Sequence, residues 1–267
     1  MTGGSGSIGS ELVRQLVEQG HKVFIFDIDE TRTYDLYEEL KQKGHWVDYY
    51  IGDIRNRDVL RDVFSDFKPE MVYHAAALKH VSPAEKMPIE YVLTNVVGTQ
   101  NVLDYASRWE CCKKFIFIST DKVVNQSSVM GQSKRLAETI VTNAGQIAVR
   151  FGNVMGSRGS VLEIWQRQLD AGEKITVTDK DMERYMMSIQ DACKLVLAAS
   201  EGEPGDIWIM KMGELKNIYE MAQEFYPDST IKIIGRRPGE ELTERLMTHE
   251  EESMAVDIGD FWVIKHK

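Results

Sequence analysis

Cysteine is scarce in this chain of 267 residues, which contains three. Cys111 and Cys112 are adjacent and Cys193 stands alone, so the sequence shows neither a disulfide framework nor the spacing of a metal site. It also lacks an apolar run long enough to cross a bilayer, and it lacks the charged and then apolar start of a signal peptide. We therefore expect a reduced, cytoplasmic protein without a membrane span and without a metal ion.

Basic residues are also in short supply. Lysine and arginine number 32 against 42 aspartates and glutamates, which gives a formal net charge of −10. An acidic chain is a poor partner for nucleic acid or for an anionic membrane, so we predict neither partner. An anionic ligand would need a local cluster of arginine and lysine. The length suits one large α/β domain, or a nucleotide-binding domain with a smaller second lobe.

Short apolar runs alternate with segments of helical periodicity over the first half to two-thirds of the chain. The runs at 23–26, 47–51, 71–73, 115–118 and 147–149 read as strands. Such alternation predicts a Rossmann-type, doubly wound parallel sheet. We predict a dinucleotide-binding domain over residues 1–151 and a smaller substrate lobe over residues 152–267, with a soft boundary and with interleaving of the two as an alternative.

A glycine-rich turn follows almost at once, because only Met1 and Thr2 precede Gly3. A Rossmann sheet has its first, central strand at this place. We therefore expect that strand to be largely missing. Either the start of the chain is truncated or misassigned, or the strand is supplied in another way. We expect the loss of the strand to cost stability.

The turn itself has glycines at positions 3, 6 and 9, and it opens into a helix. Glycine permits positive φ and a close approach of backbone to a pyrophosphate, and a helix N-terminus attracts phosphate. The next strand ends at Asp27, 18 residues after Gly9, where an acidic side chain can bind the adenosine ribose. These features predict NAD, with NADP as the alternative, bound by Gly3, Ser5, Gly6, Ser7, Ile8, Gly9 and Asp27.

Further polar residues follow later strands. Asp53 and Ile54 come after the run at 47–51 and could meet the adenine, although an ordinary turn aspartate is an equal interpretation. The run at 115–118 leads into Ser119-Thr120-Asp121-Lys122, and Met130 and Lys134 lie one helical turn apart on the helix that follows. Since ligands bind at the carboxyl ends of the strands in open α/β sheets, these side chains are candidates for a site. A surface ion pair is the alternative for Asp121 and Lys122.

Several motifs in order resemble the extended short-chain dehydrogenases, and among them the UDP-N-acetylglucosamine 4,6-dehydratases of polysaccharide biosynthesis. The motifs are TGGSGSIG, HAAALKHV, STDKVVN, MGQSKRLAE, RFGNVMGSRGS, DMERYMM and RRPGEEL. The usual Tyr-x-x-x-Lys reads Met130-x-x-x-Lys134 here, and a thioether neither gives nor takes a proton. A subset of these dehydratases is similar in this respect, which points away from sugar 4-epimerases.

The resemblance implies a role for each candidate. Lys122 would remove the C5 proton of the sugar, Asp121 would protonate the leaving C6 hydroxyl, Thr120 would bind near O4, and Lys134 would bind the nicotinamide ribose. The base needs a lowered pKa and the acid a raised one. Further cofactor contacts are implied for Ala75, Ala76, Ala77, Lys79 and Asn95. The UDP-sugar is expected to contact Lys79, Asn153, Ser157, Arg158, Ser160, Arg184, Arg237 and Glu240, although a surface salt bridge is the commoner fate of each single arginine.

The sequence thus predicts an NAD(P)-dependent lyase, a UDP-N-acetylglucosamine 4,6-dehydratase with or without inversion at C5. Its substrate would be a UDP-N-acetylhexosamine, and family members are often homo-oligomers. The alternatives are a UDP-sugar 4-epimerase of the same fold and a non-catalytic NAD-binding regulatory protein.

Overall fold

Apolar runs between polar turns form the strands of a mostly parallel sheet in the computed structural model, which describes residues 1–265. Six strands lie in the order β13-β14-β10-β5-β4-β3. Strands β3, β4, β5 and β10 are parallel, and β14 and β13 complete the sheet with antiparallel pairings. The predicted α/β fold class is confirmed. The bounds are β3 Met71–His74, β4 Lys114–Ile118, β5 Ile147–Arg150, β10 Ile207–Met210, β13 Ala255–Asp257 and β14 Phe261–Ile264.

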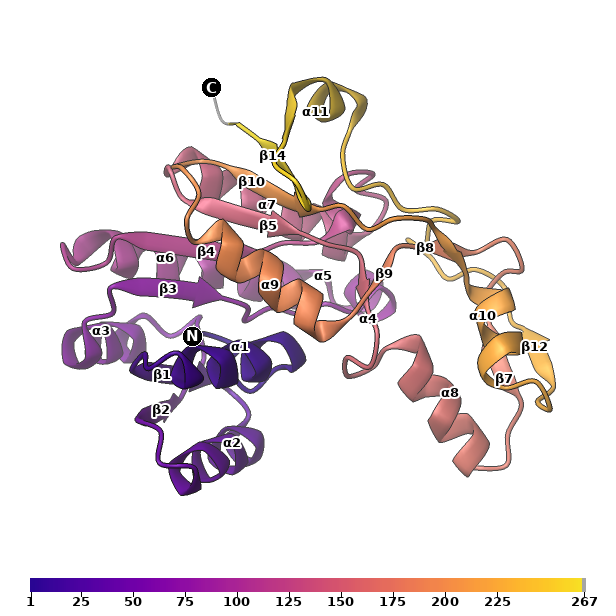
Figure 1. Ribbon diagram of the computed structural model, residues 1–267, viewed down its shortest axis with the longest axis horizontal. Coiled ribbons are helices and arrows are strands. Elements are labelled where there is room, and N and C mark those ends of the chain that lie inside the picture. The colour runs from indigo at the N-terminus through magenta and orange to yellow at the C-terminus, as the bar shows by residue number, and fades with distance from the viewer. Residues whose placement is uncertain (266–267) are drawn as a thin grey trace.

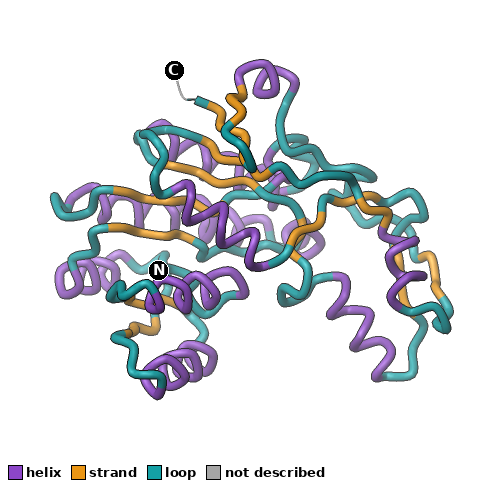
Figure 2. Tube along the Cα trace, viewed as in Figure 1, coloured by secondary structure: helices purple, strands orange, loops and turns teal. Residues whose placement is uncertain are grey.

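Helices cover both faces of this sheet (Figures 1 and 2). On one face, the apolar sides of α1 (Ser7–Glu18), α2 (Glu30–Gln42) and α9 (Ile189–Ala199) share one buried cluster. On the other, α3 (Arg57–Phe67), α6 (Thr99–Arg108) and α7 (Val129–Asn143) share a second. Shorter elements are α4 (Val81–Lys86), α5 (Pro88–Tyr91), the π-helix η1 (Val92–Gly98), the 3₁₀ turn η2 (Asp121–Val123) and α11 (His249–Met254).

The first two residues lie between β1 (Val23–Asp27) and β3, which do not pair with each other. Thr2 connects them by isolated bridges to Phe26 of β1 and His74 of β3. On its other side, β1 forms a parallel pair with β2 (Val47–Ile51). Beside the Thr2 bridges lies a small cavity of about 30 Å³. Its walls come from Met1 and Thr2, from β1 and β3, and from α3. Two residues thus occupy part of the place of a central strand.

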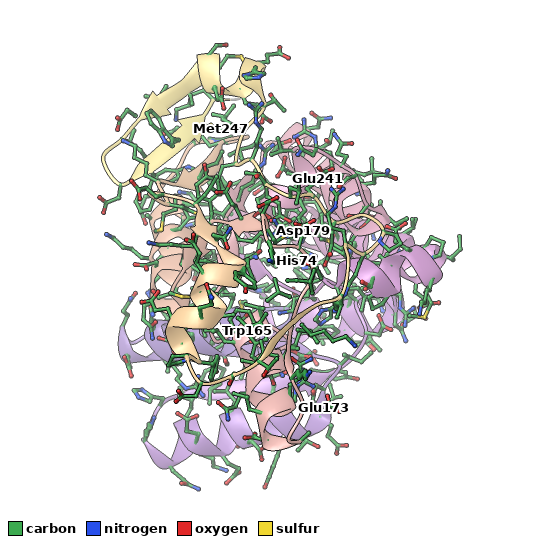
Figure 3. All side chains as sticks on the ribbon, turned by 90° about the vertical axis from the view of Figure 1, so that its right-hand side faces the viewer. His74, Trp165, Glu173, Asp179, Glu241 and Met247 are labelled. Atoms are coloured by element: carbon green, nitrogen blue, oxygen red, sulfur yellow. The ribbon has the colours of Figure 1, made fainter. Side chains whose placement is uncertain are left out.

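An outer lobe extends away from the sheet, on the right of Figure 1. Trp165, labelled in Figure 3, lies in its small core with Ile175 and Met221. The chain returns to the sheet with α9 and β10 between the two stretches of this lobe, and again with β13 and β14 after it, so the sheet draws on residues on both sides of position 152. The outer lobe comprises β6 (Asn153–Val154), α8 (Val161–Asp170), β7 (Ile175–Val177), β8 (Glu183–Arg184), β9 (Met186–Met187), β11 (Lys216–Asn217), α10 (Ile218–Phe225) and β12 (Ile231–Ile233).

A buried ion network fastens α7 and α11 to the end of β5. The Arg150 side chain is fully buried and donates to both carboxylate oxygens of Glu138 and of Glu251. Ser119 adds a hydroxyl donor to Glu138 at 2.6 Å. Burial would raise the pKa of Glu251, but the hydrogen bonds and charge of Arg150 outweigh it and hold that pKa at about 2.

Replacing Arg150 by Met should lower the free energy of unfolding by about 3–5 kcal/mol, because two buried carboxylates lose their buried counter-ion and keep only the partly exposed Arg135. Arg61→Met, which breaks only exposed ion pairs, should cost less than about 1 kcal/mol. Urea unfolding at pH 7 measures both, and equal midpoints for the two variants would contradict this role. The wild-type protein should also lose the Glu251 contribution as the pH falls from 4.5 toward about 2, since a depressed pKa stabilises only above that window.

Candidate active site

The glycine-rich turn is shaped by contacts that exclude side chains. Gly3 has φ of +65°, and a Cβ there would lie 2.6 Å from the backbone nitrogen of Ala76. A Cβ on Gly9 would overlap the carbonyl oxygen of Gly3. Helix α1 then begins at Ser7 after Gly6, which makes no side-chain cap, so the first amides of the helix have no side-chain acceptor among the described residues. A turn and helix start of this kind fit a pyrophosphate.

Asp27 ends β1 beside this turn. Its Oδ2 accepts a hydrogen bond from the Ser5 backbone at 2.9 Å, and its Oδ1 accepts one from the Asp29 backbone at 3.1 Å. The carboxylate is half-buried and lies within reach of the turn. These contacts orient it as the ribose of a dinucleotide requires, and its charge opposes a 2′-phosphate.

The loop before α8 lies against the same turn. The Arg158 guanidinium donates to the Ser5 carbonyl at 2.7 Å, and the Arg158 backbone donates to the Ser7 hydroxyl at 3.0 Å. Lys79 donates in turn to the Arg158 carbonyl at 2.6 Å. Burial lowers the pKa of both Arg158 and Lys79. The structure thus places two residues predicted to bind the sugar beside the predicted phosphate turn, where their positive charges suit an anion.

Asp53 and Ile54 are already engaged by protein groups. Asp53 forms an ion pair of 2.6 Å with Arg55, whose hydrogen bond lowers the pKa of Asp53. Ile54 is buried, and a Cβ on Gly98 would touch its side chain. Both residues therefore hold the loop after β2 in place.

Asp121 and Lys122 lie on η2, directly beyond the carboxyl end of β4. Asp121 is buried, and its Oδ1 accepts from the Thr120 hydroxyl at 2.9 Å and from Lys122 Nζ at 3.0 Å. Its Oδ2 is buried without a hydrogen-bond partner among the described residues. Burial raises the pKa of Asp121 to about 7, an effect that Lys122 opposes and Glu244 strengthens. A carboxyl group that has a pKa near 7 and a free oxygen can both accept and donate a proton at pH 7.

The Lys122 ammonium has three acceptors. Besides Asp121, it donates to Asn153 Oδ1 at 3.1 Å and to Glu244 Oε2 at 2.7 Å. Burial would lower the pKa of Lys122, but the charges of Asp121 and Glu244 outweigh it and raise that pKa. This direction is opposite to the lowered pKa that a base needs, so Lys122 rests as an ammonium ion in the structure without ligands.

Arg184 and Glu244 bring the outer lobe to this pair. Arg184 is buried and donates to the carbonyls of Leu242 and Glu241 at 2.9 Å each, and its Nε lies 3.4 Å from Glu244 Oε1. Arg184 is thus saturated by protein acceptors here. Figure 3 looks onto this side of the molecule, where Glu241 marks the segment that leads to Glu244. A small cavity of about 10 Å³ lies between this segment and the pair of Asp121 and Lys122.

The helix α7 supplies Lys134 and Met130 in different surroundings. Lys134 is buried, donates to the Ile118 carbonyl at 2.6 Å, and has a pKa lowered to about 7 by that burial. Met130 packs with Ala84 and Tyr91 in a small apolar cluster. Its side chain therefore helps to hold α7 against α4 and α5.

Asn95 is the buried polar residue of the π-helix η1. Its amide donates to the Leu78 carbonyl and to the Ser133 hydroxyl, and its Oδ1 accepts from the Leu78 backbone. The same stretch of backbone leads from the half-buried Ala75, Ala76 and Ala77 to Lys79. Asn95 fixes that backbone beside the glycine turn.

The remaining predicted residues are spread over two loops. Ser157 and Ser160 flank the start of α8, and the Ser160 hydroxyl is buried without a partner among residues 1–265. Arg237 is exposed, and its backbone donates to Glu240 in a separate turn. Ile8 packs against the core at the start of α1. Among the described residues, the structure does not bring Arg237 into contact with Asp121 or Lys122.

Sequence reasoning missed Glu244. It stands 122 positions after Lys122, and its neighbours in LTERL show no motif. Sequence reasoning also missed that Glu138 and Glu251 both form ion pairs with Arg150. No local pattern in the sequence indicates these contacts, because Glu244 and Glu251 lie about a hundred residues from their partners.

The chain matches the model of the family described as polysaccharide biosynthesis protein over residues 1–266. It belongs to this family. It is 41% identical over 99% of its length to an uncharacterized membrane protein of Methanocaldococcus jannaschii, of which it covers 84%. It is 38% identical over 94% of its length to the capsular polysaccharide biosynthesis protein CapD of Staphylococcus aureus, but it spans only 45% of that protein. Among the described residues, no helix has the length and apolarity to span a membrane.

Two further relatives are named for two different activities. The inverting UDP-N-acetylglucosamine 4,6-dehydratase of Campylobacter jejuni is 33% identical, and the UDP-glucose 4-epimerase of Rickettsia canadensis is 34% identical. Each aligns with 99% of this chain and is itself covered over 81%. The solved structure of Pen from Bacillus thuringiensis is similar with a TM-score of 0.91, at 35% identity over 98% of this chain and 85% of that one. The chain is thus related to enzymes of nucleotide sugars, and identity alone does not separate dehydratase from epimerase.

Replacing Gly9 by Ala should weaken NAD binding at least about tenfold, since the new methyl group overlaps the Gly3 carbonyl and displaces the phosphate turn. Ser10→Ala, one position further along α1, is the matched control and should bind NAD as the wild type does. Isothermal titration with NAD measures both affinities. Unchanged binding by Gly9→Ala would remove the turn from the cofactor site.

Proposed function

We propose that this chain is an NAD-dependent 4,6-dehydratase of UDP-N-acetylglucosamine that acts in the synthesis of surface polysaccharide or glycan. The observation that carries the proposal is the buried cluster of Asp121 and Lys122 at the carboxyl end of β4. It supplies an acid and an amine where Met130 replaces the tyrosine of epimerases. The related dehydratase of Campylobacter jejuni supports the same choice.

The residues that would hold the cofactor are those of the glycine turn, with Asp27 binding its ribose and with Lys134 and Asn95 toward its nicotinamide end. Bound NAD would take a hydride from C4 of the sugar and give it back at C6, so no net oxidation results. The neutralising charges for the diphosphate of the substrate would come from Arg158 and Lys79 beside the turn. Asp27 favours NAD over NADP because its carboxylate repels a 2′-phosphate.

Asp121 and Lys122 share the proton transfers. Asp121 as a carboxylate accepts the proton of the C4 hydroxyl, which Thr120 helps to orient. It then gives this proton to the C6 hydroxyl, which leaves as water. Lys122 as an amine takes the C5 proton, which the C4 ketone has made acidic, and a proton returns to C5 after C6 has been reduced. Return from Lys122 retains the configuration at C5, whereas protonation from the opposite face inverts it.

The alternative of a 4-epimerase has one specific observation in its favour, the identity of 34% to an epimerase. An epimerase, however, must move the C4 proton out and back and needs no acid at C6. The buried Asp121, with its raised pKa and a free oxygen, supports the dehydratase because it could supply that acid.

Incubation of the purified chain with NAD and UDP-N-acetylglucosamine should give a product lighter by the mass of one water, about 18 mass units, with the nucleotide intact. Lys122→Ala should lower turnover by about 10²–10⁴-fold and leave NAD affinity unchanged, because it removes the base and no cofactor contact. Mass spectrometry and isothermal titration measure these quantities. A product of unchanged mass with inverted C4 would replace the dehydratase by the epimerase, and full turnover by Lys122→Ala would exclude Lys122 as the base.

We also propose that the chain forms a homo-oligomer through the exposed side of η1 and α7. Val92, Leu93 and Val97 of η1 and Leu136 of α7 are exposed apolar residues of two helices that pack against each other. Exposed apolar side chains on neighbouring helices are expected where another copy of the chain covers them.

Replacing both Leu93 and Leu136 by Lys should convert an oligomer to monomers, because charges cannot be buried unpaired in an apolar interface. Size-exclusion chromatography with light scattering measures the mass. The double variant Ile28→Lys and Ile258→Lys, at two other exposed apolar positions, is the control and should keep the wild-type mass. Equal masses for all three proteins would contradict an interface at this place.

A further inference from the structure

Glu244 comes from the segment that joins the outer lobe to α11, yet its carboxylate lies against the amine of Lys122. Glu244 Oε2 is 2.7 Å from Lys122 Nζ, which is the shortest of the three contacts of that ammonium. The Glu244 side chain is 7% exposed, so the pair is poorly screened by water. No motif of the sequence and no step of the proposed reaction has yet used this residue.

The segment around Glu244 is held on two sides, which fixes where its charge lies. On the outer-lobe side, Arg184 binds the carbonyls of Glu241 and Leu242, and the Glu183 backbone donates to the Leu242 carbonyl. On the other side, the Ser127 hydroxyl donates to the Gly239 carbonyl at 3.2 Å. Glu244 is thus preorganised before any ligand binds, as a group that stabilises a developing charge must be.

We infer that Glu244 is a positioning residue that holds Lys122 toward the substrate and stabilises the positive charge that Lys122 gains when it removes the C5 proton. The inference rests on the proposed dehydratase function. In that step, the bond from C5 to hydrogen breaks, its electron pair stays on the sugar beside the C4 ketone, and the proton bonds to Nζ. A fixed carboxylate at 2.7 Å lowers the energy of the resulting ammonium and of the transition state that leads to it.

The negative charge of Glu244 also lowers the fraction of enzyme that is ready to react. Lys122 must be an amine and Asp121 a carboxylate before the reaction begins, and a negative charge at Glu244 raises the pKa of both groups. The other charged groups near Lys122 are Arg184 and Lys79, which oppose Glu244. Arg245 lies at the wall of the adjoining cavity. Glu244 therefore strengthens the base and reduces the fraction of enzyme in which that base is free.

This double effect gives the Glu244→Gln variant a signature that loss of structure alone does not produce. The amide keeps the shape of the side chain but lacks its charge, so the maximal kcat should fall by about 10-fold or more. The limb on which kcat rises with pH should move to lower pH, because the pKa of both Lys122 and Asp121 falls. Affinity for NAD should stay at the wild-type value.

The experiment measures kcat from the product lighter by one water between pH 5 and pH 10, and it follows exchange of the C5 hydrogen in D₂O by mass spectrometry. Glu244→Asp retains the charge on a shorter side chain and should return the rising limb toward the wild-type pH. Glu250→Gln removes one exposed negative charge of α11 and should behave as the wild type does.

A lower plateau, slower C5 exchange and a limb moved to lower pH in Glu244→Gln support the inference. A wild-type plateau and limb overturn it, and so does loss of NAD binding or a limb that Glu244→Asp does not move back, because these assign Glu244 a purely structural role. A wild-type protein that makes no dehydrated product overturns the proposed function and this inference together, whereas an active wild type with an unaffected Glu244→Gln overturns the inference alone.

Discussion

The ion pair between Lys122 and Glu244 is the interaction on which the arrangement of the site depends. It joins a residue at the end of a sheet strand to a residue of the chain that returns from the outer lobe. Both side chains are largely withdrawn from water, so their attraction is strong, and either charge left alone would be costly. This contact therefore contributes both to the position of that segment over the sheet and to the protonation of the amine. A shift of the lobe would change the chemistry of Lys122 as well as its surroundings.

The sheet and its glycine turn supply the rest of the site by simple geometry. Parallel strands end at one edge, and β4 and β5 deliver Asp121, Lys122 and Asn153 to that edge within one hydrogen-bonded group. The turn after Met1 and Thr2 meets the same edge, since Thr2 bridges to His74 at the end of β3. Arg158 and Lys79 then connect this turn to the outer lobe. A dinucleotide and a sugar diphosphate would meet across this line, with cationic groups between them.

The local elements of this fold could be predicted from the sequence, because each strand is an apolar run bounded by turn residues. The runs at 47–51 and 115–118 agree with β2 and β4 to within one residue. The glycine turn and the STDK motif were predictable for the same reason, since their residues are contiguous. Glu244 and the Arg150 network were not, because their partners lie about a hundred residues apart. The raised pKa of Lys122 could not be foreseen in full, since it depends on the adjacent Asp121 and also on Glu244, which no local pattern indicates.

The bridge made by Met1 and Thr2 has a mechanical consequence. Across the line between β1 and β3, the backbone ladder consists of the few hydrogen bonds that Met1, Thr2 and Gly3 form with Phe24, Phe26, Tyr73 and Ala75. Beyond them the two strands face a cavity instead of each other. The part that carries Asp27 is also held by α1 and α2, which share a buried apolar cluster with α9. A dinucleotide that spans from Asp27 to Lys134 would cross this seam and contact both of its sides.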